Sequence, residues 1–199
     1  TLFILPLIPG VAVFMRGYSP HEIVRQIRTR RISVVVAVPK ILEVLRKQIL
    51  RQFPEAAHLP QVQSHWIWRW YHHRRIHSSF GWKFWAFIVG GAPLAKELEE
   101  FWSGLGFAVV QGYGLTETAP LVAFNNPFAT KEGTVGKPIA GLEIKIAPDS
   151  EILVRGESVT SGYYRAPTET VSAFENGWFH TGDLGSFDDT GNLIIRGRK

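Results

Sequence analysis

The chain has 199 residues, of which 45% are hydrophobic and 20% charged, so it is long enough for one large domain or two small ones with a buried core. It contains no cysteine, which excludes disulfides, cysteine-ligated zinc and thiol nucleophiles and fits a cytoplasmic protein. The net charge of +5 is unevenly divided: residues 1–83 hold 13 Lys and Arg against 3 Asp and Glu, and residues 84–199 hold 9 against 14. The excess of Lys and Arg in residues 1–83 suits binding to phosphates or to an anionic membrane surface. A solvent-exposed helical face is the more common cause of such an excess.

The opening stretch TLFILPLIPGVAVFM is apolar but is interrupted by Pro6, Pro9 and Gly10. A helix that spans a bilayer needs about 20 apolar residues, so this stretch predicts buried core instead. It also lacks the basic start and the cleavage pattern of a secretory signal. Because the sequence starts at Thr1 without a methionine and is still basic at Lys199, we expect it to be a piece of a longer protein.

Three apolar runs predict strands buried on both faces, at residues 32–38, 85–89 and 107–111. Helical patterns lie between them, at about residues 20–31, at about 40–52 and after Pro93, with Gly104 suited to end the last helix. Strands that alternate with helices predict a parallel sheet of the α/β class.

The pattern changes after about residue 125, where short strands lie between Gly, Pro and Asp turns. These strands are predicted at residues 142–146, 151–155 and 192–197. Such spacing indicates a smaller, mainly antiparallel β subdomain. We therefore predict an α/β subdomain over residues 1–124, followed by a β-rich subdomain over residues 125–199.

The segment 61–85 holds five of the seven tryptophans. Helical spacing places five apolar residues on one face, namely Val62, Trp66, Ile67, Trp70 and Tyr71. We predict a surface helix that packs this face on the core. An interfacial helix that meets a membrane or a fatty substrate is the alternative, because Trp and basic residues favour that boundary. A metal site at His72, His73 and His77 is disfavoured, since no carboxylate accompanies them.

Two glycine-bearing loops follow two of the predicted strands: VGGAPL at residues 89–94 and QGYGLTETAP at residues 111–120. Ligands of open parallel sheets bind beyond the carboxyl ends of the strands, so the two loops are expected to border one crevice. The second loop offers Tyr113 as a flat face for stacking, Thr116 as a hydroxyl, and Glu117 as a carboxylate suited to a hard cation. The alternative is that both loops are only tight turns after the strands, which need the same glycines and bind no ligand.

Two later stretches carry further polar groups. NGWFHTGDLG, at residues 176–185, ends an apolar segment in a predicted polar turn that holds Asp183. Its carboxylate can accept hydrogen bonds from both hydroxyls of a ribose, although an Asp in a Gly-rich turn is more often there for the turn itself. IRGRK, at residues 195–199, either brings Arg198 to the same sugar or forms an exposed basic end.

In this order and approximate spacing, GGAPL, QGYGLTETAP, GWFHTGDLG and GRK resemble the AMP-forming acyl-CoA synthetases, within the wider group of adenylate-forming ligases. The connecting segments VVVAVPKILEVL, TVGKPIAGLEIKI and EILVRGESVTSGYYRAPTETVSAF are similar too, and residues 53–84 are the least so. The resemblance implies a two-step reaction. A carboxylate attacks the α-phosphate of ATP to give an acyl-adenylate and pyrophosphate, and coenzyme A then displaces AMP.

The resemblance also implies a role for individual residues. Around the adenine it places Gly91, Ala92 and Pro93 on one side, and Gln111, Gly112, Tyr113 and Gly114 on the other. The catalytic pair would be Thr116 at the α-phosphate and Glu117 at Mg²⁺. Asp183 and Arg198 would hold the ribose. These assignments agree with phosphoryl chemistry, which depends on positioning, charge stabilisation and a bridging Mg²⁺.

Two family features are missing from the sequence. The Ser/Thr/Gly-rich phosphate loop, of the form TSGTTGxPKG, does not occur, and VTSGYY at residues 159–164 resembles it only superficially. The C-terminal domain, which supplies a catalytic lysine and most coenzyme A contacts, is also missing. We therefore predict that residues 1–199 alone form no measurable acyl-CoA, although ATP or AMP still binds weakly. Thioester product from the purified chain would contradict this prediction.

The expected function is that of a fragment of an ATP-dependent acyl-CoA synthetase, with a fatty acid, ATP and coenzyme A as substrates and no nucleic acid as partner. The particular residues of the motif QGYGLTETAP favour a fatty acid as the substrate. The alternatives are a ligase that activates an amino acid or an aryl acid, and a non-enzymatic basic module that binds nucleic acid or membrane through residues 1–83. The expected location is cytoplasmic, with peripheral membrane association as the alternative.

Overall fold

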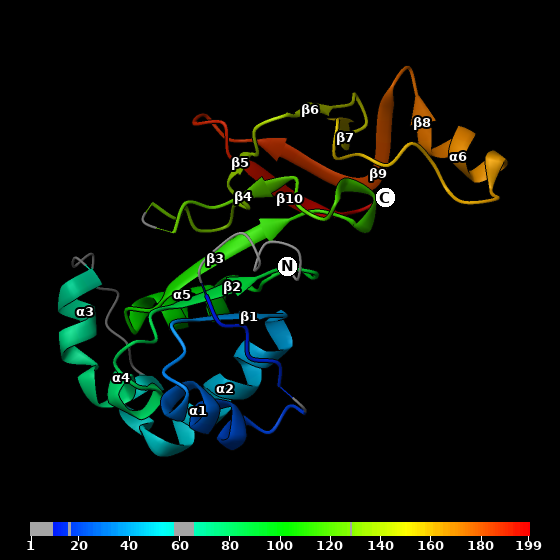
Figure 1. The fold of residues 1–199 in the computed structure, drawn as a ribbon. Helices are drawn as coiled ribbons and strands as arrows, with labels where there is room; N and C mark the ends of the chain where they lie inside the picture. The colour runs from blue at the N-terminus through cyan, green and yellow to red at the C-terminus, as the bar shows by residue number, and fades with distance from the viewer. Residues whose placement is uncertain (1–9, 16, 58–65, 128) are drawn as a thin grey trace.

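The computed structural model describes residues 10–15, 17–57, 66–127 and 129–199 (Figure 1). The helices are α1 (Pro20–Thr29), α2 (Pro39–Gln52), α3 (Trp66–His72), α4 (Arg74–Phe80), α5 (Lys96–Gly104) and α6 (Pro167–Ala173). The strands are β1 (Val34–Ala37), β2 (Ala86–Val89), β3 (Ala108–Tyr113), β4 (Ala123–Phe124), β5 (Lys137–Pro138), β6 (Leu142–Ile146), β7 (Glu151–Gly156), β8 (Phe174–Glu175), β9 (Trp178–Phe187) and β10 (Leu193–Arg198). The predicted α/β class is confirmed.

Strands β1, β2 and β3 form the predicted parallel arrangement, with Val36 opposite Ile88 and Val89 opposite Gln111. Strand β2 is largely buried, as its apolar run predicts. Burial on both faces is wrong for β1, where the side chain of Val36 is 54% exposed. Val35 and Ala37 pack against the core, so Val36 points to the opposite face of the strand.

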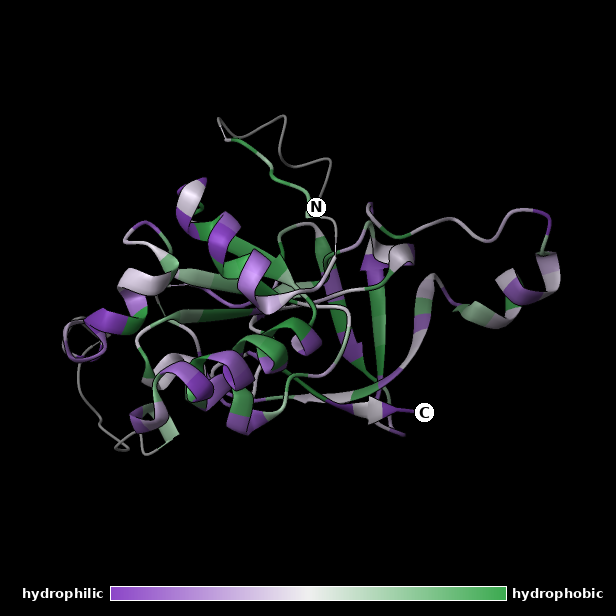
Figure 2. Ribbon diagram, turned by 90° about the horizontal axis from the view of Figure 1, so that it is seen from below, coloured by the Kyte–Doolittle hydropathy of each residue, from purple (hydrophilic) through white to green (hydrophobic). Residues whose placement is uncertain are grey.

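Helices α1 and α2 confirm the helical patterns before and after β1. Each begins with a proline, whose fixed φ suits the first turn and whose missing N–H costs nothing there. Their buried residues recur every three or four positions: Ile23 and Ile27 in α1, and Leu42, Leu45 and Ile49 in α2. These residues pack into the core beneath the parallel strands, and Figure 2 shows hydrophobic and hydrophilic residues alternating along the helices.

The core between the helices and the parallel strands is aromatic. Phe87 on β2 lies 4.7 Å from Trp102 on α5 and 4.9 Å from Phe84, measured between ring centroids. Phe80 and Phe107 complete the cluster, and all five side chains are almost fully buried. Each such pair contributes about 0.5–1.5 kcal/mol beyond the burial of its area. The cluster fixes β2 and β3, the two strands from which the glycine loops emerge.

Helix α5 ends at Gly104 as predicted, but its start differs from the prediction. Ala95 is the N-cap residue, and its carbonyl oxygen accepts the N–H groups of Leu98 and Glu99. Pro93 therefore lies in the turn before the helix and not in its first turn. The extra residues lengthen the loop between β2 and α5, which remains exposed at its tip.

Glu99 on α5 is a buried carboxylate that ties the helix to β3. Its Oε2 accepts the side-chain amide of Gln111 at 2.9 Å and the backbone N–H of Gly133 at 3.2 Å. Burial raises the pKa of Glu99 above its ordinary value, and these two hydrogen bonds oppose the rise. Glu99 in its protonated form therefore stabilises the fold below its ordinary pKa. This contribution is lost as the pH rises through the raised pKa of the folded state.

We expect the substitution Glu99→Gln to be tolerated at pH 8, because the amide oxygen keeps both hydrogen bonds and the buried charge is gone. Glu99→Ala leaves the Gln111 amide and the Gly133 N–H unpaired, which costs about 1–3 kcal/mol of unfolding free energy. Urea unfolding at pH 5 and pH 8 measures both variants. Equal losses for the Gln and Ala variants at pH 8 would mean that the negative charge itself is needed.

Strand β3 joins the two parts of the fold, because it is parallel to β2 on one edge and antiparallel to β4 on the other (Figure 1). Beyond it lies the predicted antiparallel sheet, in the order β10-β9-β7-β6, with β8 paired to β9. The strands predicted at 142–146, 151–155 and 192–197 are confirmed within one residue at each end. The predicted boundary after residue 124 lies between β4 and β5, which pair with each other, and it stays a prediction.

The tryptophan-rich segment contains two short helices, α3 and α4, in place of a single one. Val62 lies outside the described residues, as do the side chains of Trp66 and Ile67. Trp70 is half-buried as predicted, whereas Tyr71 is 55% exposed, so the predicted apolar face is narrower. Gly106, at a φ of +89°, leaves room for the α3 backbone, since a Cβ there would lie 2.9 Å from the Trp70 nitrogen.

His77 on α4 is a core residue. Its ring stacks on Phe107 at 4.1 Å, and its Nε2–H donates to the carbonyl oxygen of Leu105 at 2.8 Å. Burial lowers the pKa of His77 to about 4, so the ring is neutral at pH 7. Over the described residues, no three His, Asp or Glu side chains are grouped to hold a metal ion, and no helix is long and apolar enough to cross a bilayer.

Candidate functional site

The parallel pairing of β2 with β3 brings the start of the first glycine loop against the end of β3. A Cβ on Gly90 would lie 3.3 Å from the carbonyl oxygen of Gly112, so the backbones approach closely. Gly91 follows at a φ of +80°, where side chains are strained. Gly91, Ala92 and Pro93 follow Gly90 in this loop and are exposed.

Gly112 and Tyr113 are the last residues of β3 and are not part of a free loop. Gly112 faces Leu121 and Phe124, where a Cβ would come within 3.2 Å and 3.4 Å of side-chain carbons. Gln111 precedes them, and its side chain donates to Glu99 in the core. A contact of Gln111 with a ligand therefore depends on its backbone.

The loop after β3 is held by its own hydrogen bonds. The Leu115 N–H donates to the Thr118 hydroxyl at 3.0 Å, and that hydroxyl donates to the Leu115 carbonyl oxygen at 2.9 Å. A Cβ on Gly114 would collide with the carbonyl of Pro120, which only glycine avoids. Thr118 is buried by this arrangement, and Thr116, the predicted phosphate contact, is exposed.

Glu117 follows Thr116 in the short 3₁₀ turn at Thr116–Thr118 and contacts a segment far away in the sequence. Its Oε1 accepts the hydroxyl of Tyr163 at 3.0 Å, and its carbonyl oxygen accepts the N–H of Thr160 at 2.7 Å. Burial, and then the Glu117 carboxylate, raise the pKa of Tyr163, so the phenol stays protonated and donates. The second carboxylate oxygen of Glu117 remains available for a cation.

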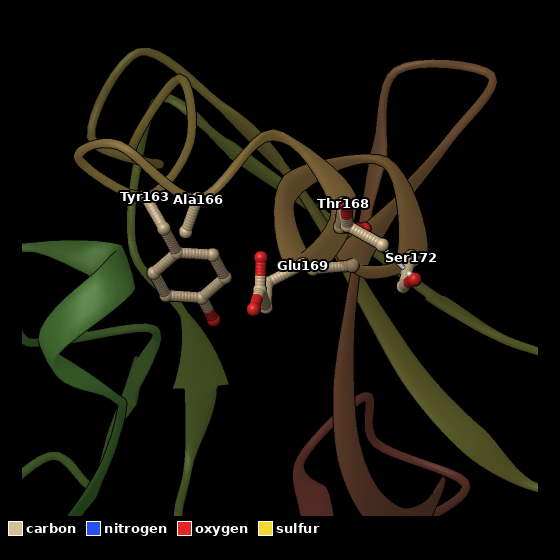
Figure 3. A pocket seen from close by; sticks show the side chains of 6 residues that line it. Tyr163, Ala166, Thr168, Glu169 and Ser172 are labelled. Atoms are coloured by element: carbon tan, nitrogen blue, oxygen red, sulfur yellow. Dashed lines mark hydrogen bonds between the residues drawn. The ribbon is translucent and has the colours of Figure 1, made fainter.

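Tyr163 also lines an open groove of about 660 Å³ between its own loop and helix α6 (Figure 3). In Figure 3 the side chain of Glu169 extends from α6 toward the ring of Tyr163, while Thr168 and Ser172 line the helix side. Because Tyr163 touches both the groove and Glu117, the groove opens next to the predicted metal ligand. The VTSGYY segment, which has no predicted role, thus contacts Glu117 through Tyr163 and Thr160.

Tyr113, Asp183 and Arg198 meet at the junction of β3 with the antiparallel sheet. The Tyr113 hydroxyl donates to Asp183 Oδ2 at 2.8 Å, and Arg198 Nε lies 3.9 Å from Asp183 Oδ1. Burial raises the pKa of Tyr113, and the bond to Asp183 raises it further. Asp183 is mostly buried, whereas the Arg198 side chain is 75% exposed. The carboxylate is fixed on one oxygen and has acceptor capacity left on the other.

Asp183 lies within strand β9, so the predicted polar turn is wrong. It pairs with Arg198 in the ladder between β9 and β10, and its own N–H donates to the Thr181 hydroxyl at 3.1 Å. Gly182, at a φ of +71°, lets the strand bend there without leaving the sheet. Asp183 is consequently held by a sheet and not by an Asx turn.

Comparison with known proteins identifies the family. Residues 1–164 match the family model described as AMP-binding enzyme. Over 127 residues, 64% of this chain, it is 46% identical to the long-chain-fatty-acid–CoA ligase FadD15 of Mycobacterium bovis. Over 196 residues, 97% of this chain, it is 29% identical to the 2-succinylbenzoate–CoA ligase of Listeria monocytogenes. The aligned parts make up 21% and 36% of these relatives, so the chain spans about a third of their length or less.

Solved structures agree with the sequence relatives. The O-succinylbenzoate–coenzyme A synthetase of Bacillus subtilis, in complex with ATP and magnesium, superposes with a TM-score of 0.67 at 26% identity, covering 92% of this chain and 35% of that one. The inhibitor-bound N-terminal domain of FACL13 from Mycobacterium tuberculosis gives a TM-score of 0.67 at 28% identity, with 93% and 43% covered. The parallel strands and the antiparallel sheet of this chain thus match the fold of these two solved enzymes. The chain belongs to the AMP-binding enzyme family.

Proposed function

We propose that this chain forms part of an ATP-dependent ligase that activates a fatty acid as its acyl-adenylate and transfers it to coenzyme A. The observation that supports this most is the Tyr113–Asp183–Arg198 group, which offers a flat ring, a carboxylate acceptor and a cation next to one another. A flat ring can stack on an adenine, and a carboxylate and a guanidinium can bind the hydroxyls of a ribose.

In this proposal Asp183 accepts hydrogen bonds from the ribose hydroxyls, and Arg198, which is exposed and close to Asp183, contacts the same sugar. Tyr113 stacks on the adenine, with its hydroxyl anchored on Asp183 so that the ring cannot swing away. Gly91, Ala92 and Pro93 border the other face of the base, and Gly112 and Gly114, with the Gln111 backbone, line its near side. Glycine suits positions 112 and 114 because a Cβ there would crowd the Leu121 side chain or the Pro120 carbonyl oxygen.

Thr116 and Glu117 are proposed to work at the phosphates. Thr116 is exposed, so its hydroxyl is free to donate to the α-phosphate. The oxygen of Glu117 that does not bind Tyr163 fits Mg²⁺, which prefers one or two carboxylates together with phosphate oxygens. Bound Mg²⁺ would neutralise charge on the phosphates during adenylation. The similar Bacillus subtilis synthetase has been solved in complex with AMP and in complex with ATP and magnesium, which supports this proposal.

A fatty acid is proposed as the carboxylate because the 46% identity to the FadD15 ligase exceeds the 29% identity to the 2-succinylbenzoate ligase. An aryl acid is the second candidate, since the aryl-acid relative aligns with nearly the whole chain. The test follows pyrophosphate release by the full-length protein that contains this chain, offered a series of saturated fatty acids, benzoate-type acids and amino acids. Release with fatty acids alone supports the proposal, and release with benzoate-type acids alone would replace it by the second candidate. Interfacial membrane contact stays a prediction.

A further inference from the structure

Glu151, the first residue of β7, is not one of the proposed nucleotide contacts. Glu151 is 4% exposed, although a carboxylate is costly to bury unless it is paired and hydrogen-bonded. The three residues that follow it in the strand, Ile152, Leu153 and Val154, are apolar and buried. A buried carboxylate at this position therefore needs hydrogen-bond donors or a positive charge next to it.

Both carboxylate oxygens of Glu151 are occupied. Oε1 accepts the backbone N–H of Gly182 at 2.9 Å. Oε2 accepts the Lys199 ammonium at 3.1 Å and His180 Nδ1 at 3.1 Å. Burial alone would raise the pKa of Glu151, but these three donors outweigh it and hold the pKa below its ordinary value. The group is thus a carboxylate at pH 7.

Two of these partners are the chain neighbours of the proposed ribose residues. Gly182 directly precedes Asp183, and Lys199 directly follows Arg198. The Lys199 N–H also donates to the Gly182 carbonyl oxygen at 2.8 Å. A single buried side chain therefore holds both sides of the place where Asp183 and Arg198 meet.

The sheet itself is irregular at this point. The register between β7 and β9 shifts between Glu151 and Leu153, and the register between β10 and β9 shifts between Ile195 and Gly197. Irregular ladders leave local backbone position less strictly fixed than regular ones. The hydrogen bonds of the Glu151 side chain connect β7 to β9 and to the end of β10 at the place where the ladders are irregular.

We infer that Glu151 is a positioning residue of the proposed nucleotide site, which holds Gly182 and Lys199 so that Asp183 and Arg198 face the same ribose. It does not touch the nucleotide. The inference rests on the proposed function, because it assigns to Glu151 the orientation of a ribose contact. A positioning role predicts that substitution of Glu151 alters ribose recognition. A purely structural ion pair would alter stability alone.

The test compares Glu151→Gln with Asp149→Asn in the full-length ligase. The Gln variant keeps the shape and one acceptor for the Gly182 N–H, but it turns an amide N–H₂ toward the two other donors. Asp149 is a matched control: it binds the same Lys199 ammonium at 2.6 Å, is half-exposed, and as Asn keeps its acceptor for the Glu151 N–H. The readouts are KM for ATP, kcat at saturating ATP, the ratio of kcat/KM for ATP over 2′-deoxy-ATP, and the melting temperature.

We expect Glu151→Gln to raise KM for ATP about tenfold, with a smaller change in kcat, and to shrink the preference for ATP over 2′-deoxy-ATP. Asp149→Asn should leave that preference at the wild-type value. An unchanged preference in the Gln variant, or an equal loss in both variants, would overturn the inference.

If Glu151→Gln does not fold, the same measurements are made on Lys199→Met. This variant removes the bond between Glu151 and Lys199 and keeps the bond between Glu151 and the Gly182 N–H. A reduced preference in that variant supports the inference and a wild-type preference overturns it. A wild-type protein that binds no adenine nucleotide would contradict the proposed function itself, which separates the two failures.

Discussion

Replacing Asp183 by alanine is expected to weaken ATP binding by at least tenfold in the full-length protein. A charge-assisted hydrogen bond contributes about 1.5–3 kcal/mol, and about 1.4 kcal/mol corresponds to tenfold in affinity. The Tyr113 hydroxyl also loses its acceptor, which frees the ring that is proposed to stack on the adenine. Calorimetric titration with ATP measures the loss.

The sharper measurement uses 2′-deoxy-ATP, which lacks one ribose hydroxyl. Wild type should prefer ATP, because the analogue leaves a carboxylate acceptor unpaired, whereas the alanine variant has no such acceptor and the preference should approach unity. Asp189→Ala is the control, since Asp189 is an exposed carboxylate in the turn between β9 and β10. If Asp183→Ala and wild type show the same preference, Asp183 only supports its strand.

The substitution Glu117→Gln is expected to reduce acyl-adenylate formation by at least about 10- to 100-fold, the loss typical of residues that only orient a metal ligand. The amide oxygen still accepts the Tyr163 hydroxyl, so the melting temperature should change little. The apparent Mg²⁺ concentration for half-maximal rate should rise, because the site has lost a charge.

Tyr163→Phe distinguishes a metal role of Glu117 from a structural one. It removes the hydroxyl that holds Glu117 and leaves the carboxylate charge in place. We expect it to affect the rate less than Glu117→Gln does and to leave the Mg²⁺ dependence closer to wild type. A collapse of thermal stability in Glu117→Gln, with adenylation per folded molecule preserved, would make Glu117 structural.

The regular elements of the fold were predictable because their signals are local. The strand runs, the amphipathic patterns of α1 and α2, and Gly104 at the end of α5 depend on residues close in sequence. The errors arise where distant contacts decide. Val36 is exposed because it lies on the face of β1 opposite the core-packed Val35 and Ala37, and Asp183 lies in a strand because β10 pairs with it.

The proposed site was predictable only in its motifs. The glycine loops and Asp183 were identifiable from the order and spacing of short sequences, whereas Tyr163 and Glu151 carry no such signal. Tyr163 reaches Glu117 from 46 positions away, and Glu151 reaches Gly182 from 31 positions away. An acidic residue at the head of an apolar strand, as in EILVRG, was the one local sign that Glu151 has partners.

The internal hydrogen bonds of the loop after β3 have a thermodynamic consequence. Leu115 and Thr118 already hold each other, and Gly114 packs against the Pro120 carbonyl, before any ligand arrives. Ordering a free loop would cost about 1–2 kcal/mol of backbone conformational entropy per residue on binding. The loop after β3 is already ordered, so little of this entropy is lost when a nucleotide binds. Most of the free energy of the contacts between loop and nucleotide therefore contributes to affinity.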